Sequence, residues 1–266
     1  MKLKHRHIII VLLAAVALFG RPETDPEKAE LALRALDSVE IPQPVYYDAF
    51  GPGEELHFSV DYGIVNAGWA IMSVVSIVEY NRRPAYYFET RAGTNKSFSV
   101  VFKVEDRAES LLDMENFHTL RHEKHIREGN YRADRWFVID QERNIARSEK
   151  YEVETYPNAL DVLSAFYYTR MLELEPGDTF HLPNHEGGKN YPLRVAVHRK
   201  ECIEVPAGRF DCIVIEPILH SPGLFDHKGN IYIWVTDDDR RMPVLMQTKI
   251  FIGNITASLV KYTLSD

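Results

Sequence analysis

The stretch Glu54–Gly63, EELHFSVDYG, alternates apolar and polar side chains with a period of two residues. Every second position is apolar, namely Leu56, Phe58, Val60 and Tyr62. Successive side chains of a β-strand point to opposite faces, so this period predicts a strand with one buried face and one face in water. The same period returns along much of the chain and therefore decides the expected fold class.

Alternating or apolar runs with short turns between them follow Gly63. We expect strands at 66–80, 97–106, 119–128, 131–140, 145–154, 191–201, 209–217, 229–237, 242–253 and 254–264. About a dozen strands with short connections are typical of antiparallel meanders that curl into barrels or half-barrels. The runs 72–78 and 231–235 are apolar on both faces, which predicts strands that are covered on both sides.

One segment, YPNALDVLSAFYYTRM at 156–171, has the three- and four-residue spacing of a helix. Asn158 is the expected N-cap, and Pro176 and Gly177 are expected to end the helix. A single apolar helix in a β-rich chain must bury its face against a sheet. The predicted fold is mainly β, with a strongly curved antiparallel sheet or incomplete barrel and one packed helix near 158–171.

The N-terminus has the pattern of an export signal. Lys2, Lys4 and Arg6 precede the apolar run Ile8–Phe19, and Ala15–Ala17 resembles a signal-peptidase site. The run is shorter than the roughly 20 residues that a membrane span needs. We expect a signal peptide or an uncleaved signal anchor at 1–20, a spacer with a short helix at 21–48, and a single β-rich domain at 49–266. The protein would then be exported to the periplasm or cell envelope of a bacterium.

The charge balance restricts the partners. Lys and Arg number 31 against 39 Asp and Glu, which gives a net charge of −8. Nonspecific nucleic-acid binding needs a basic face, so nucleic acid is not an expected partner. No compact basic cluster follows the N-terminal segment, so an anionic membrane surface is not an evident partner either.

The two cysteines of the chain, Cys202 and Cys212, flank the turn sequence Pro206–Gly208. With Ala207 at the tip of the turn, they would lie opposite each other, where cross-strand Cβ atoms are about 4.5–5.5 Å apart. An exported protein meets an oxidising compartment, so a structural disulfide is one expectation. Two buried free thiols are the alternative.

Two groups of histidines have spacings that invite a metal-site interpretation. His118, His122 and His125 would share a face on a helix, but their segment alternates as a strand. A strand separates His118 from His122 by roughly 13 Å and turns His125 to the other face, so we expect solvated polar residues. His181 and His185 lie in a predicted loop without an evident third ligand. The sequence therefore predicts no metal site and no cofactor.

The acidic stretch Trp234–Met246, WVTDDDRRMPVLM, lies between two apolar runs. Asp side chains accept hydrogen bonds from nearby backbone N–H groups, which favours turns. Arg240 and Arg241 offset the charge of the neighbouring aspartates. We predict a charged hairpin turn at 237–241.

Catalytic motifs are absent from the sequence. No serine stands in a glycine-framed elbow, and no loop has the spacing of a phosphate-binding loop. Ser164 follows Asp161 by three residues in the predicted helix, and a capping or helix–sheet hydrogen bond accounts for this pair. The sequence therefore identifies no catalytic residue and favours a protein that is not an enzyme.

Four blocks of the sequence resemble a known family. They are GEELHFSVDYGIVNAGWA, ALDVLSAFYYTRMLELEPGDTF, VPAGRFDCIVIEP and KGNIYIWVTDDDRRMPVLM, and they span about Gly53 to Tyr262. In this order they are similar to the bacterial domain of unknown function 3108. The resemblance implies an exported envelope protein with a β-rich fold, and it transfers no activity and no site residue.

These observations lead to a hypothesis of a non-enzymatic protein that binds or carries a hydrophobic or amphipathic, lipid-like ligand. Aromatic side chains could line an apolar cavity of a curved sheet, as in small barrels. The candidate ligand-binding residues are Tyr62, Trp69, Phe166, Tyr167 and Trp234. Two alternatives stay open: a structural or assembly partner of another envelope protein, and a cell-wall or lipid hydrolase that would use His181 and His185.

Overall fold

The computed structural model describes residues 41–219, 231–249 and 253–265. The expected signal segment and the spacer helix before residue 41 lie outside the described residues. Among the described residues, no helix is long and apolar enough to cross a membrane.

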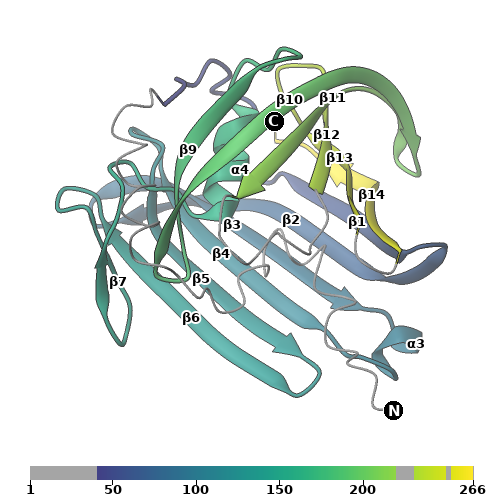
Figure 1. Cartoon of the computed structure of the whole chain (residues 1–266), viewed down its shortest axis with the longest axis horizontal. Coiled ribbons are helices and arrows are strands. Elements are labelled where there is room, and N and C mark those ends of the chain that lie inside the picture. The colour runs from purple at the N-terminus through teal and green to yellow at the C-terminus, as the bar shows by residue number, and fades with distance from the viewer. Residues whose placement is uncertain (1–40, 220–230, 250–252, 266) are drawn as a thin grey trace.

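The described chain forms one antiparallel sheet of fourteen strands and two helices (Figure 1). The helices are α3 (Lys96–Ser99) and α4 (Val162–Arg170). The strands are β1 (Glu55–Tyr62), β2 (Val65–Tyr80), β3 (Arg83–Thr94), β4 (Glu105–Asp113), β5 (Thr119–Glu128), β6 (Tyr131–Asp140), β7 (Ile145–Arg147), β8 (Glu152–Glu154), β9 (Thr179–Glu186), β10 (Lys189–Val205), β11 (Gly208–Leu219), β12 (Ile231–Thr236), β13 (Pro243–Lys249) and β14 (Asn254–Thr263).

The strand order joins two meanders. Strands β1 to β8 follow one another in one direction, β9 to β14 follow one another in the other, and β1 pairs with β14 between them. The edge strands are β8 and β9, which do not pair with each other, so the curled sheet does not close. This confirms the predicted curved antiparallel sheet or incomplete barrel.

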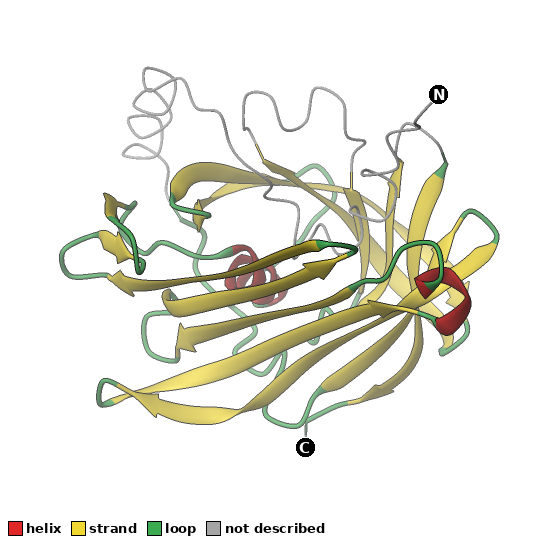
Figure 2. Ribbon diagram, turned by 90° about the horizontal axis from the view of Figure 1, so that it is seen from below, coloured by secondary structure: helices red, strands yellow, loops and turns green. Residues whose placement is uncertain are grey.

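Helix α4 lies inside the curl of the sheet (Figure 2). Tyr167 is fully buried and stacks on Phe88 of β3, with ring centroids 3.8 Å apart. Arg170 is also buried and binds Glu54 through two hydrogen bonds of 2.6 and 2.8 Å. Helix α4 therefore packs against the inward face of the sheet, as its apolar face predicts.

The helix begins later than predicted. Its N-cap is Asp161, whose side chain accepts a 2.9 Å hydrogen bond from the Leu163 N–H. Asn158, the predicted cap, has φ of 55° and stands in a turn. Residues 159–161 are extended, because their backbone groups form hydrogen bonds with other strands. The helical spacing of apolar residues in the sequence does not reveal these bonds.

Four other local predictions were wrong. The expected strand 145–154 is interrupted at residues 148–151 and forms the two short strands β7 and β8. Residues 97–104, expected as a strand, form α3 and a loop, because the Asn95 side chain caps a helical turn at the Phe98 N–H. Strand β3 was not predicted, since RRPAYYFETRAGT does not alternate cleanly. The region 179–186, expected as a loop, is strand β9.

The hairpin of β10 and β11 curves back across the outside of the sheet. The Ala207 N–H at its tip donates a 3.0 Å hydrogen bond to the Leu259 carbonyl of β14, and Phe210 contacts Tyr262. This hairpin covers the outer face of β12, which confirms that 231–235 is covered on both sides. For 72–78 the prediction was wrong, because Val75 and Ile77 are 44% and 47% exposed.

The expected disulfide is not formed. Pro206 and Ala207 make a two-residue turn in which Val205 pairs with Gly208, so Cys202 lies opposite Asp211 and Cys212 opposite Glu201. The shift of one residue turns the two thiols to opposite faces. Cys202 is exposed, and Cys212 is buried, which raises the pKa of its thiol to about 12.

The acidic stretch 237–241 is a hairpin turn, as predicted. Asp238 Oδ1 accepts hydrogen bonds from the backbone N–H groups of Arg240 and Arg241 and from the Thr236 hydroxyl. Arg241 also lies 3.5 Å from the Asp237 carboxylate. Lys200 of β10 lies 3.2 Å from the same carboxylate, so a cation outside the turn helps to offset its three aspartates.

Candidate functional site

The residues before α4 join the two halves of the curled sheet. The Thr119 N–H of β5 donates to the Ala159 carbonyl at 3.1 Å. The Leu160 N–H donates to the Pro183 carbonyl of β9 at 2.7 Å, and its carbonyl accepts from the His185 N–H at 2.8 Å. Residues 159–161 therefore bridge β5 and β9, and the side chains around this bridge form a buried polar cluster.

Asp161 is the centre of this polar cluster. Its carboxylate accepts hydrogen bonds from Ser110 Oγ at 2.5 Å and from Thr119 Oγ1 at 2.8 Å, in addition to the helix N–H groups. Ser110 Oγ also lies 2.7 Å from Ser164 Oγ. Since Ser110 donates its one proton to Asp161, Ser164 donates to Ser110.

The cluster of Ser110, Ser164 and Asp161 does not form a catalytic arrangement. A nucleophilic serine needs a base within hydrogen-bonding reach. The structure shows no histidine hydrogen-bonded to either serine in the described chain, and Ser110 already donates to a carboxylate. The predicted capping and helix–sheet role of Asp161 and Ser164 is confirmed.

Two buried histidines lie beside this cluster. The rings of His122 and His185 are 5.7 Å apart, and both contact the Phe137 ring. Within the described part of the chain, neither ring nitrogen of His185 has a hydrogen-bond partner, and His122 Nε2 has none. A buried ion pair between Lys124 and Glu186, 2.6 Å long, lies on the same two strands.

The burial of these histidines favours their neutral forms. Burial lowers the pKa of His122, and burial together with His122 lowers the pKa of His185 well below its ordinary value. The prediction that His118 and His122 are solvated was wrong, since both are buried. His125 lies on the face of β5 opposite His122, as predicted, but a β-bulge between His118 and His122 means that these two do not share a face as expected.

Acidification is expected to destabilise the protein through these histidines. Below about pH 6.5 the unfolded chain binds more protons than the folded protein, so the free energy of unfolding falls by up to about 1.4 kcal/mol per pH unit for each histidine. Urea unfolding between neutral pH and pH 5 measures this slope. His185→Phe should reduce it, whereas the control His57→Gln, at a partly exposed position, should keep it. An unchanged slope in His185→Phe contradicts the expectation.

The outer face of β4 and β5 carries a second cluster of polar residues. One oxygen or nitrogen of each of Glu109, Glu123 and His125 lies within 4.8 Å of the others, so these residues could hold a metal ion. They line a pocket of 410 Å³ together with Tyr80, Tyr87, Arg107, Ser110, Leu111, Arg121 and His122.

The acidic groups of this pocket are already engaged. Arg107 donates to Glu109 at 2.6 Å, and the Tyr87 hydroxyl donates to the same carboxylate. Burial raises the pKa of Glu109, but these hydrogen bonds outweigh it and hold the pKa below its usual value. Arg121 pairs with Glu123 at 2.7 Å. The pocket is a balanced network of charges with aromatic and apolar edges.

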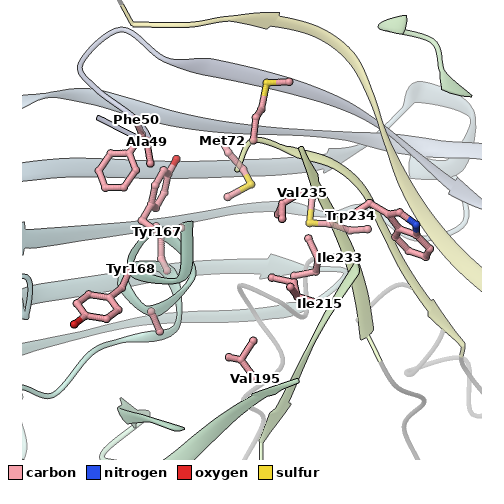
Figure 3. Packing of buried hydrophobic residues seen from close by; sticks show 14 of the residues in the cluster. Ala49, Phe50, Met72, Tyr167, Tyr168, Val195, Ile215, Ile233, Trp234 and Val235 are labelled. Atoms are coloured by element: carbon pink, nitrogen blue, oxygen red, sulfur yellow. The ribbon is translucent and has the colours of Figure 1, made fainter. Parts of the chain in front are cut away.

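The five candidate ligand-binding residues do not lie together. Tyr62 ends β1 on the inward side, and Phe166 and Tyr167 lie on α4, with Phe166 only partly buried. Trp69 is on the outer face of β2 beside Gly93. Trp234 points away from Ile233 (Figure 3) and donates a 2.6 Å hydrogen bond to Glu201 of the overlying hairpin.

Sequence reasoning missed most of the polar cluster. Ser110, Thr119 and Lys124 are isolated polar residues in strands, and only the fold brings them to Asp161 and His185. The positions of Ser110 and Lys124 carried a weak signal, since they share the inward parity of β4 and β5 with buried apolar residues, whereas a β-bulge shifts Thr119 out of this parity.

The sequence of this sheet matches a defined family over residues 57–260, from β1 to β14. The family is described as "Protein of unknown function (DUF3108)". The chain belongs to the DUF3108 family. This confirms the resemblance of the four sequence blocks, and the match includes α4, both strands of the bridge and the outer pocket.

One solved structure shows that the fold of this DUF3108 protein recurs in another family. A crystal structure of a β-barrel-like protein of domain of unknown function DUF1849 from Brucella abortus has a TM-score of 0.58 at 8% identity, covering 82% of this chain and 99% of that one. It shows a shared β-barrel-like fold. A "putative lipoprotein" from Parabacteroides distasonis has a TM-score of 0.39 at 11% identity, with 83% and 100% covered, which does not establish a common fold. The comparison with curated protein sequences found no match.

Proposed function

We propose that this DUF3108 protein is exported to the bacterial envelope and there binds or carries a hydrophobic or amphipathic ligand without catalysing a reaction. The observation that supports binding most directly is an apolar wall on the inward side of the sheet. Export is supported by the charged N-terminus, the apolar run Ile8–Phe19 and the small residues Ala15–Ala17.

The apolar wall crosses six neighbouring strands. The register places one inward residue of each strand side by side: Val60, Ala257, Met246, Ile233, Ile215 and Val197. The next row continues with Tyr62, Ile255, Thr248 and Ile231. No charged side chain occupies these ten described positions. Figure 3 shows Val195, Ile215 and Ile233 pointing to the same side, toward α4.

The opposite part of the inward face is lined by small and polar residues. Ala70 of β2 lies opposite Ala92 of β3, and Ala92 lies opposite Asp106 of β4. In the neighbouring row, Ala108 lies opposite Lys124. Ala70 and Ala92 are small and pack with Val104 and Phe102, and the buried carboxyl of Asp106, whose pKa burial raises, supplies a polar contact. These chemistries together suit a ligand with an apolar body and a polar head.

A bulky side chain at Ala70 is expected to weaken ligand binding. The hydrophobic dye 1-N-phenylnaphthylamine serves as the probe, and its fluorescence reports the titration. Ala70→Trp should raise the Kd by about tenfold or more, which corresponds to about 1.4 kcal/mol of lost binding. The matched control Val75→Trp lies on the outer face of the same strand and should bind as the wild type does.

Native mass spectrometry of the protein purified from its own envelope provides the independent measurement. A bound apolar molecule of defined mass supports the proposal. If the purified chain carries no such molecule and the wild type does not bind the dye, the proposed function is wrong.

A further inference from the structure

Three turns at one end of the sheet hold large apolar side chains out into solvent. Ile64 and Val65, between β1 and β2, are 102% and 52% exposed. Val100 and Val101, directly after α3, are 88% and 77% exposed, and Tyr131 at the start of β6 is 42% exposed. Single exposed apolar residues are ordinary on protein surfaces, but a group of them marks an interaction site. These five residues are called the apolar rim.

Backbone hydrogen bonds join the three turns into one rigid edge. The Asn95 N–H donates to the Ala67 carbonyl at 3.0 Å, and Asn95 Nδ2 donates to the Asn66 carbonyl at 2.7 Å. On the other side, the Gly129 N–H donates to the Lys103 carbonyl at 2.8 Å. The loop after α3 is therefore fixed to the β1–β2 turn and to the β5–β6 turn. In Figure 1 these turns lie along the lower right side.

The shape and charge of the apolar rim favour a lipid surface over a folded partner. Its side chains stand on separate turns, and Ile64, Val100 and Val101 are 77% or more exposed, whereas a protein interface presents a closely packed patch. Lys96 and Arg132 are exposed beside the Val100–Val101 tip and Tyr131, and Lys103 shares its charge with Glu105 at 3.0 Å. Apolar tips with neighbouring cations and an aromatic ring suit the boundary of an anionic bilayer.

We propose that the apolar rim docks the protein on an anionic phospholipid surface by inserting Ile64, Val100 and Val101 between the headgroups. No residue of the rim belongs to the apolar wall, although Val65 of the rim pairs with Tyr62 of the wall. The net charge of the whole chain is negative, and the apolar tips therefore supply most of the attraction.

Position-specific labelling of the full chain tests the proposal. An environment-sensitive nitrobenzoxadiazole dye is attached at Val100→Cys in a Cys202→Ser background, where the remaining Cys212 is buried. Vesicles of phosphatidylethanolamine and phosphatidylglycerol should shift its emission to the blue and raise its intensity severalfold. The matched probe at Val75→Cys should stay unchanged. The apolar N-terminal run alone could hold the chain on vesicles, and a site-specific dye separates that attachment from docking by the rim.

Charge substitutions give the second measurement. Ile64→Asp with Val101→Asp should abolish the shift of the dye at position 100, while Val75→Asp with Ile77→Asp should preserve it. Both pairs are exposed, and equal circular dichroism and Tm verify that folding is intact. The proposal is overturned if the chain sediments with vesicles while the dye at position 100 stays in water. A shift without vesicles that grows with protein concentration assigns the rim to a second copy and also overturns it. An equal shift on phosphatidylcholine vesicles would show that the anionic headgroup is not recognised, and it overturns the proposal as well.

Discussion

Replacing Glu54 by alanine is expected to lower the free energy of unfolding by about 3–5 kcal/mol, because it leaves the guanidinium of Arg170 buried without its counter-charge. Arg170 and Glu54 are both almost inaccessible to solvent, and their two hydrogen bonds are 2.6 and 2.8 Å long. Arg170 also donates to the Ala49 and Arg240 carbonyls, so it cannot turn toward water. For a chain of this size the loss corresponds to a decrease in Tm of about 10 °C or more.

Two comparisons isolate the effect of the buried charge. Glu152→Ala breaks the exposed 2.6 Å pair with Arg147 and should cost at most about 1 kcal/mol. The double variant Glu54→Leu/Arg170→Met leaves no buried charge and should recover most of the stability. Chemical denaturation of the four proteins measures the differences. A Glu54→Ala variant as stable as Glu152→Ala would show that the pair does not hold α4 in the sheet.

The second large effect is expected for Asp161→Ala, at about 3–5 kcal/mol. The variant loses the cap of α4, which is worth about 1 kcal/mol in an ordinary helix. It also leaves the buried hydroxyls of Ser110 and Thr119 without their acceptor, at about 1–3 kcal/mol each. The cost should therefore clearly exceed that of removing a helix cap alone.

Asn95→Ala is the matched control for Asp161→Ala, because Asn95 caps α3 without a buried network. Its cost should stay near about 1 kcal/mol. Urea unfolding monitored by circular dichroism compares the two variants. Equal costs would mean that the hydroxyls of Ser110 and Thr119 find other partners and that the polar cluster adds nothing to the closure of the sheet.

The strands that could be predicted are those whose two faces meet different surroundings. In 54–63 and 119–128 one face packs in the core and the other meets water, so the alternation is visible. Strand β9 was missed because Pro183 and its histidines suggest a loop, although the backbone of residues 159–161 bonds to it. The pairing of β9 depends on tertiary contacts, which leave no local pattern in the sequence.

The sites were less predictable than the fold for the same reason. Asp161 and Ser164 could be paired from their spacing in the helix, but Ser110 and Thr119 come from strands more than forty residues away. The disulfide prediction was wrong because the turn is one residue shorter than expected. The two thiols therefore point to opposite faces of the hairpin. The part of the apolar rim at Val100 and Val101 was predicted as a strand, because the surrounding residues alternate in sequence. The Asn95 cap starts a helical turn there instead.

The pairing of β1 with β14 has a consequence for how the chain is made. The two strands lie side by side, Glu55 opposite Thr263, although nearly all of the described sequence separates them. Such contacts of long sequence separation slow folding, since a large loop must close before they form. The middle of the sheet therefore cannot be completed until β14 has left the ribosome. A chain held open in this way would remain unfolded until β14 is synthesised, which is compatible with the proposed export.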